Sequence, residues 1–511
     1  MQVKRYVWSL IPRSLVSVAV LCSPAQADET AKPSGMVLAD PRVKKSAGSA
    51  WRTIVTGRLG NGVRFAILPR RSNEPGVGLL MRNAGGFIAE RRPGERGLAH
   101  LIEHIVFRSP TTGSPDDLGH FPHIGLPLTF PAAQVATTTW RESNWFLSTR
   151  TTRVNDLDRI LALFREAATD LTFRADAVDI ERVSVMREMA DKTLGNRIYA
   201  DYIAALAPGS PNDVLDAQNS DEVSTASIDT LRRLYHRLYR PEAMMIVVVG
   251  DVDPAVIRAL VEKRFGDWKR DKLGPRRESV PLFQKDRLRP VSYSALPQGR
   301  RTAILGIVLP TPKLAVSRAA QAKAMLMDLV AVRAVSDRLT AMQPGASADK
   351  TGLYIENAEP GHRQIEVWDG FAAGTWRPAI ARLRRVTCAL KTAGFTSAEW
   401  RAAKRRVFTD LQQRTTTMAT VPNVELAKDL SHAMADGRAL ISPDEMLRHA
   451  QVLLPAIDAR EGSDWWQRQW HAGIEHLRVE SPEFAQVSDP ISTIRAADSA
   501  VIPAACKKPQ Y

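Results

Sequence analysis

The sequence has few of the residues that cross-link a chain or anchor it in a membrane. It contains three cysteines among 511 residues, so a disulfide framework is excluded. Cys22 lies in the N-terminal segment, and Cys388 and Cys506 either pair in an oxidising compartment or remain two free thiols. No hydrophobic run reaches the roughly 20 residues that span a bilayer, which excludes a helical membrane protein.

Acidic residues are also outnumbered. The chain has 55 aspartates and glutamates against 70 lysines and arginines, and its formal net charge is +15. A basic chain can bind nucleic acid, anionic lipid or acidic substrates. The basic residues are dispersed, however, and no nucleic-acid-binding motif is present. The excess charge therefore indicates a solvated basic surface and no nucleic-acid partner.

The first 27 residues differ in kind from the rest of the chain. Basic residues precede the apolar stretch 14–22, and the small-residue triplet Ala25-Gln26-Ala27 follows it. This order is typical of a secretory signal peptide cleaved after Ala27. It predicts a periplasmic protein without a stable membrane anchor, because Leu21 is bulky where lipoprotein signals have a small residue.

The remaining sequence falls into two halves with a similar order of predicted elements. Each half begins with β-like runs, which are followed by amphipathic helices, further strands and further helices. This repetition predicts an α+β protein with two similar domains. The predicted segments are a signal peptide at 1–27, a flexible leader at 28–50, a first domain at 51–267, a linker at 268–286, a second domain at 287–480 and a tail at 481–511.

Residues 97–107 read "GLAHLIEHIVF" and place three polar side chains in an apolar run. On a helix, residues four apart lie on the same face, so His100 and His104 converge and can bind one metal ion. Glu103 lies beside them, where it could hold a water attached to that metal. The H-x-x-E-H order is a zinc-peptidase signature. The alternative is a pair of interior histidines with an incidental ion pair.

A third ligand is predicted on the helix that starts near Ala175. Glu181 and Glu188 are seven residues apart, two helical turns, on a surface otherwise rich in valine and methionine. A carboxylate on such a surface is costly unless it binds a cation or a histidine. Glu188 is therefore the predicted ligand, and Glu181 is predicted to orient a ligand histidine. The alternative is surface ion pairing with Arg182 and Arg187.

Together these segments resemble the pitrilysin/insulinase-type zinc peptidases, which include the mitochondrial processing peptidases. The resemblance runs from Trp51 to about residue 480. "LGNGVRFAILP" is similar to the family's first hairpin, "GLAHLIEHIVF" to its metal helix and "IERVSVMREM" to its third-ligand helix. The resemblance implies two domains, each a mostly antiparallel sheet packed with helices, that form half of a clamshell.

The resemblance further implies a zinc endopeptidase that encloses peptides or small unfolded proteins in a chamber. One Zn²⁺ per chain would be bound by His100, His104 and Glu188. Glu103 would act as general base towards the water that attacks the scissile carbonyl. One chain supplies half of a shell, so the resemblance also implies a dimer.

One departure from the family bears on that dimer. The family's other half carries the pattern R-E-K-R-G-L-A-Y, which supplies an arginine and a tyrosine to the transition state, whereas the matching loop here is "PGASADKTGLYIE". Aligning Tyr354 with the tyrosine puts Ser347 at the arginine, and sliding by one residue gives Ala348 and Ile355. We therefore expect a heterodimer whose partner supplies the Arg/Tyr pair. A homodimer and a non-catalytic scaffold subunit are the alternatives.

Four other histidines are not assigned to the site. His120 and His123 lie in the insertion "SPDDLGHFPHIGLPLTFP", a predicted surface loop, where solvated histidines are more common than a second metal site. His471 and His476 are five residues apart and would fall on different faces of a helix. Residues that bind the substrate remain unassigned.

Overall fold

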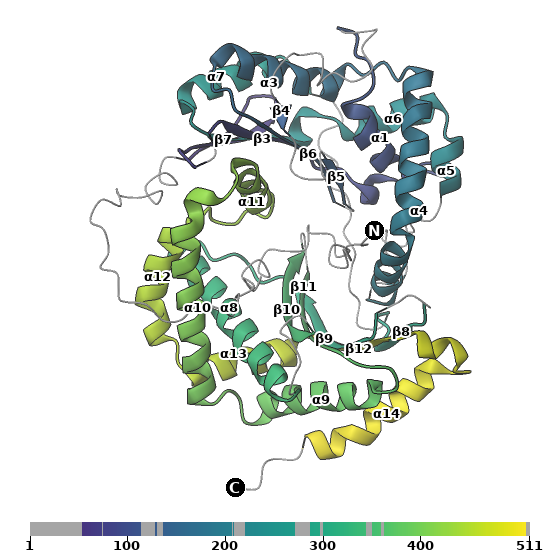
Figure 1. Ribbon diagram of the computed structural model, residues 1–511, viewed down its shortest axis with the longest axis vertical. Helices are drawn as coiled ribbons and strands as arrows, with labels where there is room; N and C mark the ends of the chain where they lie inside the picture. The colour runs from purple at the N-terminus through teal and green to yellow at the C-terminus, as the bar shows by residue number, and fades with distance from the viewer. Residues whose placement is uncertain are drawn as a thin grey trace, which may run out of the picture.

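The computed structural model describes residues 54–73, 75–113, 128–129, 136–139, 141–206, 208, 220–270, 287–296, 300–343, 350–358 and 362–506. The predicted signal peptide, the leader and most of the linker lie outside these residues, as do His120, His123, Ser347 and Ala348. The described chain forms two α+β units, each built on one sheet (Figure 1). Among the described residues, no helix is both long enough and apolar enough to cross a membrane.

The first sheet has the order β1-β2-β7-β3-β6-β4, with β5 also paired to β6. β2 and β7 are parallel, and the other described pairs are antiparallel. The strands are β1 (Val55–Arg58), β2 (Arg64–Pro69), β3 (Val77–Asn83), β4 (Leu128–Thr129), β5 (Ala136–Thr138), β6 (Ser143–Thr149) and β7 (Met244–Gly250). The helices of this unit are η4 (Phe87–Ala89), α1 (Leu98–Val106), α3 (Val154–Thr169), α4 (Ala175–Leu206), α5 (Ser220–Thr225), α6 (Ile228–Leu238), η6 (Pro241–Ala243) and α7 (Pro254–Phe265).

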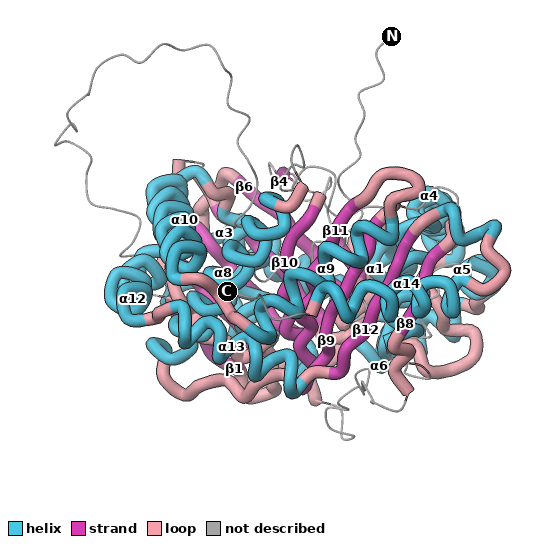
Figure 2. Tube along the Cα trace, turned by 90° about the horizontal axis from the view of Figure 1, so that it is seen from below, coloured by secondary structure: helices cyan, strands magenta, loops and turns pink. Residues whose placement is uncertain are grey.

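The second sheet has the order β10-β11-β9-β12-β8. Its strands are β8 (Val291–Ser294), β9 (Thr302–Pro310), β10 (Thr351–Ala358), β11 (His362–Gly370) and β12 (Ile474–Glu480). Figure 2 shows β9 and β12 side by side, with α9 and α14 in front of the sheet. The helices after β9 are α8 (Arg318–Ala341), α9 (Trp376–Thr392), α10 (Ser397–Thr417), η7 (Met418–Thr420), α11 (Asn423–Ala435), α12 (Pro443–Ala456), α13 (Ala459–Ala472), η8 (Pro482–Gln486) and α14 (Pro490–Ala505).

The two sheets repeat one topology. In the first unit β2 pairs in parallel with β7, and β7, β3, β6 and β5 then follow in antiparallel order. In the second unit β8 pairs in parallel with β12, and β12, β9, β11 and β10 follow in the same way. The predicted α+β fold of two similar domains with mostly antiparallel sheets is confirmed.

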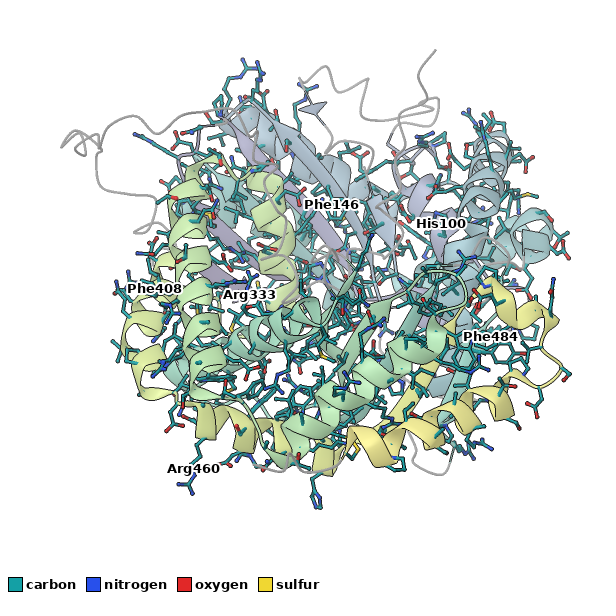
Figure 3. All side chains as sticks on the ribbon, turned by 60° about the horizontal axis from the view of Figure 1, so that its bottom comes forward. His100, Phe146, Arg333, Phe408, Arg460 and Phe484 are labelled. Atoms are coloured by element: carbon teal, nitrogen blue, oxygen red, sulfur yellow. A yellow bond between two sulfur atoms is a disulfide. The ribbon has the colours of Figure 1, made fainter. Side chains whose placement is uncertain are left out.

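Helix α11 crosses the predicted domain boundary, because it packs on the first sheet although it follows the second in sequence. Val424 and Leu430 of α11 join a buried cluster with Leu80, Phe146 and Val247 of that sheet. Figure 3 labels Phe146, whose ring lies 4.4 Å from Nζ of Lys428 on α11. A helix from the second half of the chain therefore completes the core on one face of the first sheet.

This contact also explains Gly78 on β3. A Cβ atom at Gly78 would lie 2.4 Å from the backbone N of Val424, so only glycine lets α11 approach the sheet. The side chain of Asn423 donates to the backbone O of Gly76 (3.1 Å) at the same contact.

The predicted tail beyond Glu480 is wrong over most of its length. Residues 490–505 form α14, which packs on α9 and buries Ile494 completely. Pro490 occupies the first turn, and Asp489 caps it by accepting a hydrogen bond from the backbone N of Ser492. Composition alone had indicated a tail because proline and serine are read as helix breakers, whereas here they begin a helix. Cys388 and Cys506 form a disulfide between α9 and the end of α14.

Candidate metal centre

Helix α1 starts at a glycine that no other residue could replace cheaply. Gly97 has a φ of 78°, and a Cβ atom there would lie 2.7 Å from Cγ2 of Val223. Gly97 cannot cap the helix with a side chain, so the buried carboxylate of Glu90 does it instead. Glu90 accepts hydrogen bonds from the backbone N of Gly97 (2.8 Å) and of Ala99 (2.7 Å). Burial raises the pKa of Glu90 to about 8, although both hydrogen bonds lower it.

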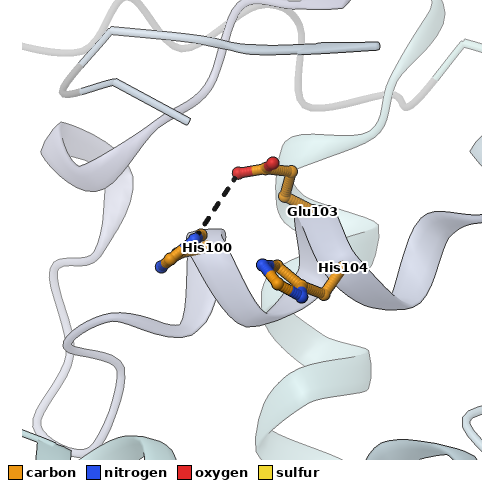
Figure 4. Close-up of side chains that lie close together, drawn as sticks. All are labelled: His100, Glu103 and His104. Carbon is orange, nitrogen blue, oxygen red and sulfur yellow. Dashed lines mark ion pairs between the residues drawn. The ribbon is translucent and has the colours of Figure 1, made fainter. Parts of the chain in front are cut away.

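The predicted motif residues lie on one face of α1. His100 and His104 have ring centroids 5.0 Å apart at an interplanar angle of 78°. Oε2 of Glu103 lies 4.0 Å from Nε2 of His100 (Figure 4). Ligand atoms of these three side chains all lie within 4.8 Å of one another.

Helix α4 brings both predicted glutamates to this face. Oε2 of Glu188 lies 3.7 Å from Nε2 of His100 and 3.4 Å from Nε2 of His104. Two atoms bound to zinc at about 2.1 Å and at the tetrahedral angle are about 3.4 Å apart, so this spacing fits a shared ion. Glu103 is farther from His100 than Glu188 is, as expected for a group beside the ion and not bound to it.

Glu181 lies behind His104. Its Oε2 is 3.0 Å from Nδ1 of His104, and its Oε1 accepts from Arg108 (3.3 Å). A carboxylate at Nδ1 favours the tautomer with its proton on Nδ1, which leaves the lone pair of Nε2 facing Glu188 and His100. The alternative pairing of Glu181 with Arg182 is not found, because Arg182 donates to the backbone O atoms of Val223 and Ala226.

Trp145 is a site residue that the sequence did not reveal. The indole N–H of Trp145, on β6, donates to the backbone O of Glu103 (3.1 Å), and its side chain is fully buried. A buried tryptophan needs a partner for its N–H, which was the available signal. The partner is 42 residues away in the sequence, however, and no local pattern points to it.

The second sheet carries three residues that were considered above for the site: Tyr354, Ile355 and His476. Tyr354 lies on β10 and donates to Oε2 of Glu356 (3.1 Å), whereas Ile355 is buried in the second core. The expectation that His476 lies on a helix is wrong, since it lies on β12 and is 2% exposed.

Comparisons with known proteins bear on the family. Residues 225–407 match the sequence model described as the Peptidase M16 inactive domain, a range that does not include α1. The "Probable zinc protease PqqL" of Escherichia coli is 28% identical over 214 residues, covering 41% of this chain and 22% of that protein. The protein of that name in Haemophilus influenzae is 22% identical over 406 residues, covering 76% of this chain and 42% of its own length. The chain thus spans less than half the length of these curated relatives.

The fold has solved counterparts. The crystal structure of the periplasmic protease PqqL from Escherichia coli matches with a TM-score of 0.73 at 21% identity, covering 90% of this chain and 50% of that one. A structure of the first half of that protease is covered to 97%. The matching sequence model, the relatives named as zinc proteases and the repeated two-sheet fold confirm the predicted resemblance to the M16, insulinase-type peptidases.

Proposed function

We propose that this chain is a periplasmic zinc endopeptidase that cleaves peptides or small unfolded proteins. The observation that carries the proposal is the position of Oε2 of Glu188, which lies 3.7 Å from Nε2 of His100 and 3.4 Å from Nε2 of His104, separations that suit one shared ion. Relatives named as zinc proteases and a similarly folded periplasmic protease support it.

The residues divide the chemistry between them. A zinc ion held by His100, His104 and Glu188, one per chain, would supply a Lewis acid that polarises a water molecule and the scissile carbonyl. Glu103 accepts the proton of the attacking water and returns it to the leaving amine. Its carboxylate suits this role because it lies on the same face of α1 as the two histidines and is 7% exposed. Glu181 fixes the ring of His104, and Trp145 fixes the backbone of α1 at Glu103.

We also propose that the chain works with a second, homologous subunit. The match covers 50% of the longer periplasmic protease, and the proposed subunit takes the place of that protease's other half in a closed chamber. Ser347 aligned with the family's arginine in the sequence, and a partner that carries an Arg/Tyr pair would complete the transition-state contacts. This favours a heterodimer over a homodimer.

The test measures metal and cleavage in the same samples. Purified protein should contain zinc near one per chain and should cleave an unfolded peptide, alone or with a homologous half-length chain. Glu188→Ala should lose both, whereas Asp179→Asn, which removes an exposed carboxylate from the same helix, should lose neither. Absence of zinc from carefully purified wild-type protein would favour the non-catalytic scaffold. Full activity of the isolated chain would contradict the heterodimer.

A further inference from the structure

Helix α4 has one end in each unit of the protein. Its first half contributes Val178, Val185 and Met189 to the core of the first unit. Its last turns bring Tyr202 and Leu206 against Val308 of the second sheet. The helix that carries Glu181 and Glu188 is therefore positioned by the second unit as well as by the first.

Tyr202 makes the central contact at the far end of α4. Its hydroxyl donates to Oε1 of Glu366 on β11. The guanidinium of Arg478 on β12 lies 4.9 Å from the centre of its ring. Arg478 also donates to two groups of α4, the backbone O of Ile198 (3.3 Å) and Oδ2 of Asp201 (3.1 Å). Side chains of β11 and β12, the two strands that flank β9, thus fix the end of the helix.

The surroundings make this contact rigid. Arg478 is fully buried, and Glu366 is 7% exposed. Gly306 on β9 leaves the room they need, since a Cβ atom there would lie 2.8 Å from Cγ of Glu366 and 2.9 Å from Nε2 of His476. Hydrogen bonds between buried groups in a low dielectric are strong, and leaving one partner unsatisfied is costly. Such a contact holds α4 in one place.

Geometry connects this contact to the metal centre. Tyr202 follows Glu188 by 14 residues, which is about 21 Å along a helix that rises about 1.5 Å per residue. Glu188 and Tyr202 lie on one continuous helix, and such an element can transmit a displacement of one end along its axis. A small displacement at Tyr202 therefore moves Glu188, and zinc tolerates errors of only about 0.2 Å in its ligand distances.

We propose that Tyr202 is a positioning residue of the metal centre, because its hydrogen bond to Glu366 fixes the end of α4 and thereby the place of Glu188 opposite His100 and His104. The inference rests on the proposed zinc site. It assigns to the second unit, which carries no ligand of that site, a part in holding one.

The experiment measures zinc affinity of the full-length chain by competition with a chelator. Tyr202→Phe removes one hydroxyl and keeps the ring under Arg478, and it should weaken zinc binding about tenfold. Glu366→Gln keeps an acceptor for that hydroxyl and should stay within twofold of wild type. Val367→Ala is the matched control, since Val367 is a neighbouring residue buried in the second core. It should destabilise the protein without changing zinc affinity.

Hydrogen exchange of the metal-free protein gives a second measurement. Amides of residues 181–189 should exchange faster in Tyr202→Phe than in Val367→Ala, although their sequence is unchanged. Wild-type zinc affinity and exchange in Tyr202→Phe, or an equal loss in Val367→Ala, would overturn the inference and leave the proposed function intact. A wild-type protein that binds no zinc would overturn both.

Discussion

The helix pair α1–α4 of the first unit and the pair α8–α10 of the second occupy equivalent places in the repeated fold, yet their polar contacts differ in kind. In each pair the first helix follows the second strand of the repeat and packs on the second helix of the pair. On α8, Arg333 pairs with Asp410 (2.7 Å) and Arg338 with Glu399 (2.6 Å). On α1, in contrast, the side chains that face α4 are histidines, and they contact Glu181 and Glu188. Figure 3 labels Arg333 and His100 in their two units.

This difference shows that the shared fold does not by itself determine where a metal-type site forms. Arginine is always charged and has no lone pair to offer, so an arginine–carboxylate pair is a closed structural contact. Neutral histidine offers one nitrogen lone pair, and with carboxylates on the facing helix it forms a ligand set. The same helix packing thus serves stability in one unit and the proposed metal site in the other.

The strongest way to break the comparison is to make the first pair resemble the second. His104→Arg should reduce the zinc content from about one per chain to almost none and abolish cleavage. The new guanidinium can pair with Glu181 and Glu188, so the metal-free variant should unfold within a few degrees of metal-free wild type. Metal analysis and thermal unfolding in a chelator measure the two effects. Zinc retained by His104→Arg would contradict the ligand assignment.

Glu103→Gln separates the base from the ligands. The amide has nearly the same shape but cannot accept a proton, so kcat/KM for an unfolded peptide should fall about 1,000-fold. The zinc content should stay at the wild-type value. A parallel loss of zinc would instead show that Glu103 acts as a ligand, a role that its 4.0 Å separation from His100 argues against.

Glu181→Gln tests the carboxylate behind His104. Groups that orient a metal-bound histidine typically contribute a factor of about 10 to 100 in metal affinity, and we expect a loss of about tenfold here. Arg108→Gln removes the other partner of Glu181 and should leave the affinity near wild type, because Arg108 is largely exposed. An equal loss in Arg108→Gln would mean that the Arg108 ion pair, and not the contact with His104, matters.

The local parts of this site could be predicted from the sequence. The motif on α1 spans little more than one helical turn (His100, Glu103 and His104), and the two glutamates on α4 are two turns apart (Glu181 and Glu188). Helical spacing alone therefore places each set on a common face of its helix. Their meeting across α1 and α4 needed the family resemblance, because a helical pattern does not say which helix faces which.

Contacts between distant segments could not be predicted. The hydrogen bond from Trp145 to the backbone of Glu103, the cap that Glu90 provides for α1 and the packing of α11 on the first sheet all depend on the tertiary fold. The sequence likewise left undecided whether Cys388 and Cys506 are bonded, because their pairing requires α14 to dock on α9.

The smallest effect is expected where the second pair loses one of its closed contacts. Burial acts to raise the pKa of Glu399, but hydrogen bonds from Arg338 and Thr396 outweigh it, so the pKa is lowered below its usual 4.5. This stabilisation is present above pH 4.5 and is lost as the pH falls through the lowered pKa. Glu399→Gln should therefore cost about 1 kcal/mol of unfolding free energy at pH 7 and less at pH 3. Zinc affinity at pH 7 should not change, because Glu399 pairs with Arg338 and is not part of the proposed zinc site. Denaturant unfolding at both pH values measures the first effect, and a zinc affinity that fell with Glu399→Gln would mean that the two helix pairs are coupled.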